Sequence, residues 1–170
     1  AIKEDAAAAI ATMKELGIKH IIILTGDAKA VGDAIAKKLG ITEVYSELLP
    51  QDKVAKFEEI LSRKKKNEKV AFVGDGINDT PVLARSDIGI AMGGLGSDAA
   101  IEAADVVIMD DKPSKIGAAM LVAKDTRRIV WQNILFALGA KGLFLILGAF
   151  GVASMWEAVF ADVGVTVIAV

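Results

Sequence analysis

Two acidic residues follow an apolar run near the middle of the chain and could hold a metal ion together. Asp75 and Asp79 lie in the stretch Gly74-Asp75-Gly76-Ile77-Asn78-Asp79, directly after the run Val70–Val73. The run predicts a buried parallel strand, and the glycines permit a tight turn at its end. Two carboxylates in one small volume repel each other unless a cation joins them. Because oxygen ligands favour Mg²⁺, and Mg²⁺ usually works with a phosphate, the stretch predicts a site for both.

Two further groups could complete a site for a phosphoryl group. Thr25-Gly26-Asp27 ends the apolar run His20–Leu24, and Lys53 lies near the start of a predicted helix. A hydroxyl and backbone amides can hold a phosphoryl oxygen, and a lysine can neutralise its charge. Each group has a simpler alternative. Thr25 and Asp27 could cap the following helix, and Lys53 could be a solvated lysine at a helix start.

The elements that must position these residues alternate along the first two thirds of the chain. Apolar periodicity predicts a β-strand before each candidate site residue or its helix, and helices between most of the successive strands. Helices are expected over Lys3–Leu16, Lys29–Leu39, Gln51–Lys65 and Ser97–Ala103, and strands over Ile18–Leu24, Val44–Tyr45, Val70–Val73, Asp87–Ala91 and Val106–Met109. This alternation predicts an α/β fold with a doubly wound parallel sheet and a site at the carboxyl ends of its strands.

Composition divides the chain into a soluble part and a membrane part. Hydrophobic residues make up 54% of the 170 residues and the mean hydropathy is +0.48. The excess is local, because only Lys141, Glu157 and Asp162 are charged after Arg128. The net charge of −2 argues against a nucleic-acid partner. The chain has no cysteine, which excludes disulfides and thiolate metal sites within it.

The membrane part predicts one complete span and the start of a second. A helical pattern runs from Ser114 into Ile134–Ala153, which is about 20 residues long and could cross a hydrocarbon core of roughly 30 Å. A polar turn, Ser154–Glu157, precedes the incomplete second span Ala158–Val170. Trp131 and Trp156 suit the two interfaces. We expect a soluble domain over residues 1–122 and a stalk and membrane segment over 123–170.

The charges around the first span predict its orientation and a polar site within it. Lys124, Arg127 and Arg128 precede the span and place the soluble domain in the cytoplasm. Lys141 lies about 18 Å below Ile129, and the depth of Asp162 makes an ion pair between the two geometrically reasonable. The alternatives are a snorkelling lysine and an acidic residue near the outer interface.

Three motifs together resemble a known family. Thr25-Gly26-Asp27, Pro50-Gln51-Asp52-Lys53 and Gly74-Asp75-Gly76-Ile77-Asn78-Asp79 are similar to the later motifs of the haloacid-dehalogenase-like fold, in the form that P-type ATPases carry. The resemblance covers essentially the whole chain. It implies that Thr25, Gly26 and Asp27 contact the phosphoryl group and that Lys53 stabilises its charge. It also implies that Asp75 binds Mg²⁺ together with Asp79, and that Asn78 and Asp79 support both functions.

The chain also departs from that family's pattern. The phosphorylated aspartate of the family lies in an Asp-Lys-Thr-Gly-Thr motif, which this sequence does not contain. The ATP-binding domain and the earlier membrane helices are likewise expected outside it. We therefore expect the second half of a phosphorylation domain followed by the start of the last pair of membrane helices. Alone it should not hydrolyse ATP, and its partners should be the lipid bilayer and the remaining domains of a pump.

The membrane part resembles one subgroup of these pumps. Ala161-Asp162-Val163-Gly164 after Ala140-Lys141-Gly142 is similar to the pumps that export Zn²⁺, Cd²⁺ and Pb²⁺ across the cell membrane. The resemblance implies that Asp162 is a ligand of the transported ion and that Lys141 is its built-in counter-ion. A carboxylate suits a divalent metal better than Cu⁺. Open alternatives are a pump for Cu⁺ or K⁺, a membrane-tethered phosphatase of the same fold, and a regulatory fragment.

Overall fold

The computed structural model describes residues 2–74, 77–93, 98–151, 156 and 163–164. The chain divides into two compact units, Ala1–Ala118 and Ala119–Val170, which are described separately. The boundary expected after residue 122 stays a prediction.

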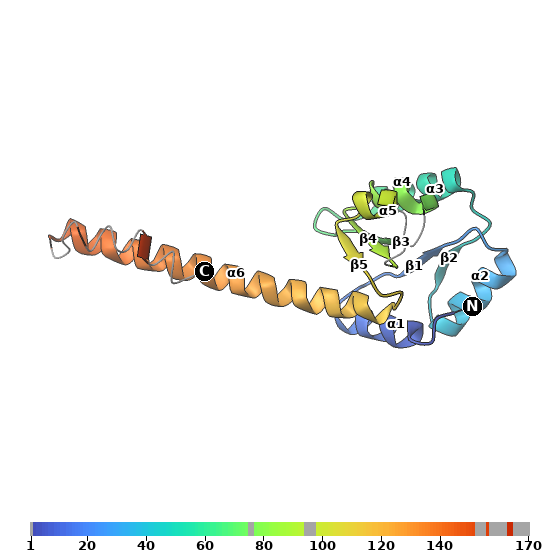
Figure 1. Cartoon of the computed structure of the whole chain (residues 1–170), viewed down its shortest axis with the longest axis horizontal. Coiled ribbons are helices and arrows are strands. Elements are labelled where there is room, and N and C mark those ends of the chain that lie inside the picture. The colour runs from blue at the N-terminus through green and yellow to red at the C-terminus, as the bar shows by residue number, and fades with distance from the viewer. Residues whose placement is uncertain (1, 75–76, 94–97, 152–155, 157–162, 165–170) are drawn as a thin grey trace. The chain divides into compact units, whose positions relative to one another are not determined.

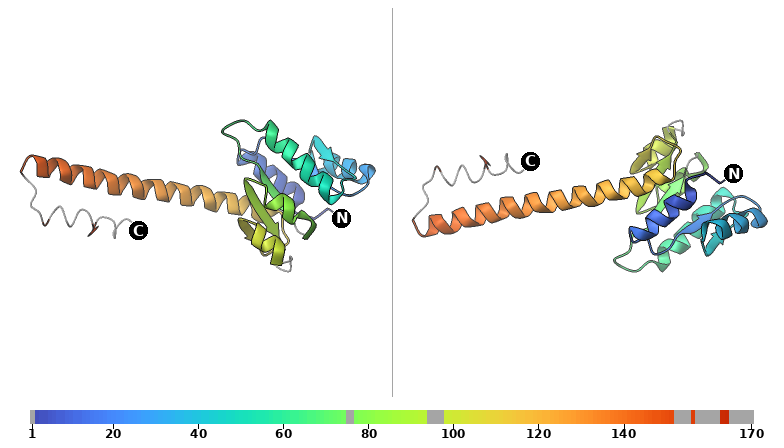
Figure 2. Two further views of the ribbon diagram at one scale, coloured as in Figure 1. Left: turned by 90° about the horizontal axis from the view of Figure 1, so that it is seen from above. Right: turned by 90° about the horizontal axis from the view of Figure 1, so that it is seen from below.

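The first unit alternates helices and strands as predicted (Figure 1 and Figure 2). The short helices over residues 77–83 were not predicted, whereas the other helices and strands lie within a few residues of the expected ranges. In chain order the elements are α1 (Ala6–Glu15), β1 (Ile22–Leu24), α2 (Lys29–Leu39), β2 (Glu43–Tyr45), α3 (Pro50–Arg63), β3 (Ala71–Gly74), the 3₁₀-helix η1 (Ile77–Asp79), α4 (Thr80–Leu83), β4 (Ile88–Met92), α5 (Asp98–Ala103) and β5 (Val106–Ile108). The first expected strand is shorter than predicted, because only its last three residues pair with β2.

The strands are all parallel, but in the described residues they form two sheets and not one. β1 pairs with β2, with Ile23 opposite Val44. β4 lies between β3 and β5, with Ile90 opposite both Val73 and Val106. The expected continuous sheet is therefore interrupted between β1 and β3, which share no ladder in the described residues. Each of these two strands has one edge without a partner strand there.

The core of the first unit lies where α3 and α4 cover the larger sheet. Val82 and Leu83 are fully buried, and Phe57 of α3 packs edge-on against Phe72 of β3 with ring centroids 5.4 Å apart. Gly89 of β4 leaves little room for a side chain, because a Cβ there would lie 3.0 Å from the carbonyl oxygen of Leu83. Apolar contacts of this kind hold α3 and α4 against the larger sheet, whose strand β3 leads into the acidic stretch Gly74–Asp79.

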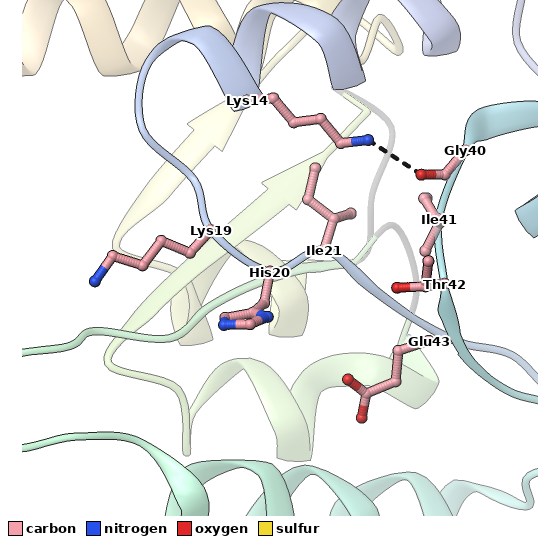
Figure 3. A pocket seen from close by; sticks show the side chains of 8 residues that line it. All are labelled: Lys14, Lys19, His20, Ile21, Gly40, Ile41, Thr42 and Glu43. Carbon is pink, nitrogen blue, oxygen red and sulfur yellow. Dashed lines mark hydrogen bonds between the residues drawn. The ribbon is translucent and has the colours of Figure 1, made fainter.

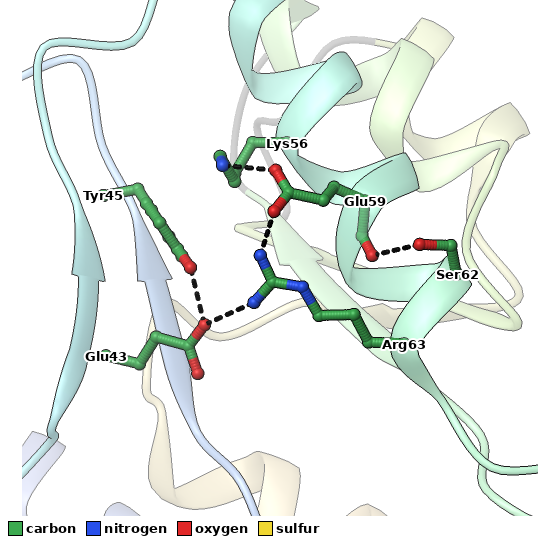
Figure 4. A network of polar contacts seen from close by, with 6 residues as sticks. All are labelled: Glu43, Tyr45, Lys56, Glu59, Ser62 and Arg63. Carbon is green, nitrogen blue, oxygen red and sulfur yellow. Dashed lines mark hydrogen bonds and ion pairs between the residues drawn. The ribbon is translucent and has the colours of Figure 1, made fainter.

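Charged side chains attach α3 to the smaller sheet (Figure 4). Glu43 of β2 accepts a hydrogen bond of 2.7 Å from the Tyr45 hydroxyl and lies 3.6 Å from the Arg63 guanidinium. On α3, Glu59 pairs with Lys56 and with Arg63. Hydrogen bonds first from Lys56 and then from Arg63 lower the pKa of Glu59. The network connects β2 to α3, the helix that carries Lys53.

Asp87 joins the beginnings of β3 and β4. Its carboxylate accepts a hydrogen bond of 2.9 Å from the backbone amide of Val70 and pairs with Lys64 and Lys69. The hydrogen bond from Lys64 is the main cause, followed by that from Val70, of a pKa lowered from 3.8 to about 2. Asp87 therefore favours the folded state as a carboxylate.

The helix α6 spans Ser114–Ala149. It is long and apolar enough to cross a membrane. The predicted end of the first span at Ala153 is wrong for the helix, which ends at Ala149. The amide of Gly151 donates to the carbonyl of Gly148, and Gly151 has a φ of 70°. A glycine in this left-handed conformation terminates a helix. The polar turn and the second span lie almost wholly outside the described residues.

We predict that Asp87→Asn reduces the stability of the first unit by about 1–2 kcal/mol at neutral pH, because charge-assisted hydrogen bonds are lost. The pKa of Asp87 is depressed on folding, so its contribution is fully present above pH 3.8 and is lost as the pH falls toward 2. Denaturant unfolding from pH 7 to pH 2 should show a smaller acid destabilisation in the variant. Asp33→Asn, which removes an exposed carboxylate of α2, is the control; an equal effect of both substitutions would contradict the account.

Candidate active site

The structure brings Lys53 and Asp79 together. The Lys53 Nζ lies 2.9 Å from the Asp79 Oδ1, and the two side chains are only 18% and 13% exposed. Lys53 lies in the first turn of α3, which follows β2, whereas Asp79 ends η1, which follows β3. The pair therefore joins the carboxyl-terminal end of the smaller sheet to that of the larger sheet. The alternative of a solvated lysine is wrong, since Lys53 is largely buried and paired.

The Thr25 loop, residues Thr25–Asp27, is a compact turn at the end of β1. The Thr25 hydroxyl donates to the Asp27 Oδ2 at 3.0 Å and accepts from the Asp27 backbone amide at 3.1 Å. This turn does not cap α2, because the N-cap residue of that helix is Ala28 and no side chain makes a capping hydrogen bond there. The capping alternative is therefore wrong. The hydroxyl instead lies in a loop with exposed polar groups at a strand end, where ligands of parallel sheets bind.

Gly74 permits the close approach of Asp79 to the end of β3. A Cβ on Gly74 would lie 2.8 Å from the Asp79 Cβ and 3.1 Å from its Oδ2. This contact explains why a glycine ends the strand: any side chain would displace the partner of Lys53. Asn78 precedes Asp79 in η1 and is exposed.

The oxygen atoms at the end of β3 fit a hard cation such as Mg²⁺. One Asp79 oxygen is paired with Lys53, while Oδ2 makes no hydrogen bond with a described residue, and Asn78 offers an exposed amide oxygen. Among the described residues there is no group of three or more acidic or histidine ligands. Asp75, the main predicted ligand, lies outside the described residues. The Mg²⁺ assignment of Asp75 and Asp79 therefore stays a prediction.

Sequence reasoning missed two features beside these residues. The Thr80 hydroxyl, which follows Asp79, is buried and has no hydrogen-bond partner in the described part of the chain. Glu47, between β2 and α3, has a φ of 59° and is the one non-glycine residue with a positive φ in the described part. Glutamate carries no signal for the left-handed conformation, which glycine and asparagine favour, so the sequence could not have indicated it.

The predicted membrane site is only partly described. Lys141 lies within α6, about 18 Å along the helix from Ile129 and about 12 Å from the helix end at Ala149. Asp162 lies outside the described residues. Its pairing with Lys141 therefore stays a prediction.

A small cavity of about 170 Å³ lies away from the candidate site (Figure 3). It is lined by residues 19–21, which precede β1, and 40–43, which lead into β2; Lys14 donates to the Gly40 carbonyl oxygen at 3.1 Å beside it. These residues mark the amino-terminal end of the smaller sheet. The cavity is therefore at the opposite end from Thr25 and contains none of the predicted site residues.

With this geometry established, comparison with known proteins identifies the family. The model of the haloacid dehalogenase-like hydrolases matches residues 1–87, which include the Thr25 loop, Lys53 and Asp79. The chain belongs to this family. Its parallel sheets, with candidate residues at the carboxyl ends, agree with that assignment.

The individual proteins to which the chain is most usefully compared are metal-transporting P-type ATPases. The chain is 69% identical over 99% of its length to the cadmium, zinc and cobalt-transporting ATPase of Bacillus subtilis, and 56% identical over 99% to the zinc-transporting ATPase of a Synechocystis strain. These matches cover 24% and 23% of the lengths of the two relatives. A crystal structure of a zinc-transporting PIB-type ATPase in the E2.Pi state matches 99% of the chain and 27% of its own, with 40% identity and a TM-score of 0.88. The chain thus spans about a quarter of the relatives that it matches, and the expected resemblance is confirmed.

We predict that Gly74→Ala lowers the stability of the first unit by about 1–3 kcal/mol, because the added Cβ overlaps Asp79. The loss should be measured by thermal or denaturant unfolding. Val73→Ala, at the preceding and 39% exposed position of the same strand, serves as the control and should have a smaller effect. A Gly74→Ala variant as stable as the parent chain would show that the contact with Asp79 is not close.

Proposed function

We propose that this chain is part of an ATP-driven pump that exports divalent metal ions through an aspartyl-phosphate intermediate. The observation that carries the proposal is the largely buried Lys53–Asp79 pair, which joins the ends of two parallel sheets beside the Thr25 loop. The similarity of the whole chain to metal-transporting ATPases supports it.

In this proposal the first unit stabilises the phosphoryl group. Thr25, with Gly26 and Asp27, contacts the phosphoryl oxygens, and the charge of Lys53 offsets the charge that they develop. Asp79 holds the Lys53 ammonium in place, as its 2.9 Å contact supports. Mg²⁺, held by Asp75 with Asp79 and Asn78, would neutralise further phosphate charge.

We place the phosphorylated aspartate on a strand outside this chain. β1 and β3 each have one edge without a partner among the described residues, and both strands lead into candidate site residues. A parallel strand between these edges would end between the Thr25 loop and Asp79. An aspartate at that carboxyl end would face both groups, as ligand sites of α/β sheets require. ATP would be bound mainly by a further domain.

The transported ion is proposed from the membrane segment. Asp162 would be a ligand of the ion, and Lys141 would replace the ion's charge when the site is empty. The names of the relatives favour Zn²⁺ and Cd²⁺, and they add Co²⁺, which the motifs did not indicate. Pb²⁺, expected from the resemblance, stays a prediction.

The sequence of α6 supports a proposal for the location and orientation of the protein. We propose an integral protein of the cell membrane with the first unit in the cytoplasm, because Lys124, Arg127 and Arg128 precede the apolar part of the helix. The membrane-tethered phosphatase is not favoured, since the relatives over the whole chain are transport ATPases.

The activity is tested by phosphorylation of the intact protein. Incubation with labelled ATP should give an acid-stable, hydroxylamine-sensitive phosphoenzyme, and Zn²⁺ or Cd²⁺ should stimulate its turnover. Stimulation by Cu⁺ or K⁺, with no response to Zn²⁺, Cd²⁺ or Co²⁺, would contradict the proposed substrate. Absence of the phosphoenzyme under all conditions would contradict the proposed mechanism.

Two substitutions in the intact protein separate the transport site from the phosphoryl site. Asp162→Ala should abolish metal-stimulated turnover, a loss of at least about a hundredfold, but spare phosphorylation by inorganic phosphate, which needs no transported ion. Asp75→Ala should damage both reactions, because Mg²⁺ is needed for each. If Asp75→Ala leaves both reactions intact, the Mg²⁺ assignment is wrong.

A further inference from the structure

Two residues between β2 and α3 contact the Thr25 loop through their backbone. The amide of Leu48 donates to the carbonyl of Thr25 at 3.1 Å, and the amide of Glu47 donates to the carbonyl of Asp27 at 2.9 Å. The carbonyl oxygen of Leu48 also lies close to Gly26, where an added Cβ would approach it to 3.2 Å. The segment Ser46–Leu48, here called the bracket, therefore holds both ends of the loop.

Contacts with α2 and with the start of α3 also fix the position of the bracket. The Ser46 hydroxyl is buried against Gly32 of α2, where a Cβ would lie 2.1 Å from the Ser46 Oγ. The bracket continues directly into Leu49, whose amide donates to the Asp52 carboxylate at 3.2 Å and whose carbonyl accepts from the Lys53 amide at 3.0 Å. A single short segment thus links the Thr25 loop to the helix turn that carries Lys53.

The conformation of Glu47 is what allows this link. Its φ of 59° is the left-handed value that reverses the chain, so that the amides of residues 47 and 48 both donate to the loop. A non-glycine residue in this region is strained by about 1–2 kcal/mol and persists only where surrounding contacts hold it. The Glu47 side chain itself is exposed. Its backbone, and not its charge, is therefore the feature that the structure uses.

We propose that Glu47 is a positioning residue for phosphoryl transfer, because the bracket sets the Thr25 loop against Lys53. The inference rests on the proposed function, in which Thr25 and Lys53 contact one phosphoryl group. Two groups on different elements act on the same ligand only when their separation is fixed, and a displacement of about 1 Å can cost a hundredfold in rate. The bracket supplies this fixed separation through backbone hydrogen bonds.

The test compares proline substitutions at two left-handed positions of the intact pump. Glu47→Pro removes the amide that donates to Asp27 and imposes a φ near −65°. Gly40→Pro imposes the same change at the end of α2, where φ is 64° and no contact with the Thr25 loop is made. The readouts are half-inhibition by orthovanadate, a mimic of phosphate, and phosphoenzyme formation from inorganic phosphate. Thermal unfolding of each variant is measured alongside.

Glu47→Pro should weaken orthovanadate inhibition by roughly ten- to a hundredfold, whereas Gly40→Pro should leave it within about twofold at a comparable loss of thermal stability. Glu47→Gly should retain parental orthovanadate inhibition, because glycine readily adopts the left-handed conformation. Glu47→Gln should also retain it, because this substitution removes only the charge of the exposed side chain. If the proline variants do not fold, the pair Glu47→Val and Gly40→Val applies the same comparison with a milder strain.

Equal effects at positions 47 and 40, or parental orthovanadate inhibition in a folded Glu47→Pro variant, would overturn the proposal. A failure of the proposed function is distinguishable from this result. In that case the parent protein itself would form no phosphoenzyme and show no inhibition by orthovanadate.

Discussion

The Lys53–Asp79 ion pair is the contact on which the arrangement of the candidate site depends. It is largely buried, and its two residues come from elements that follow different sheets. In the described residues these sheets share no ladder, so side chains must hold their ends together. Breaking a buried pair leaves one charge unpaired, which makes such a contact costly to lose. Two further features support the pair. Gly74 leaves space for Asp79 at the end of β3. The bracket holds the Thr25 loop next to the start of the helix that carries Lys53.

The same contacts explain how two separate sheets can present one candidate site. α3 packs Phe57 on Phe72 of the larger sheet, and its charged residues pair with Glu43 of the smaller sheet. One helix therefore contacts both sheets in the first unit and carries Lys53 as well. A strand inserted between β1 and β3 would meet edges whose ends already bear the residues proposed to contact a phosphoryl group. The helix α6, most of whose residues belong to the second unit, is suited to a membrane.

Much of this arrangement could be predicted from the sequence, and the exceptions have physical causes. The ranges of α2 and α3 were predicted to within two residues, because Gly40 and Pro50 mark their ends. Lys53 and Asp79 were each predicted as site residues, but their pairing was not, since it depends on tertiary contacts between elements 26 residues apart. The interruption of the sheet was missed because strand alternation indicates parallel order and not which neighbours are hydrogen bonded. The predicted span ended at Ala153, after the observed helix end at Ala149, because an apolar run does not show which of its glycines adopts the left-handed conformation.

A double-mutant cycle on Lys53 and Asp79 tests the central claim most directly. The free energy of unfolding of the chain is measured for the parent, Lys53→Ala, Asp79→Ala and the double variant at neutral pH. If the pair holds the two sheets together, each single substitution is strongly destabilising, and the double variant loses less than the sum of the two. The coupling free energy should then be about 1–3 kcal/mol. Additive losses, with a coupling free energy near zero, would contradict the account.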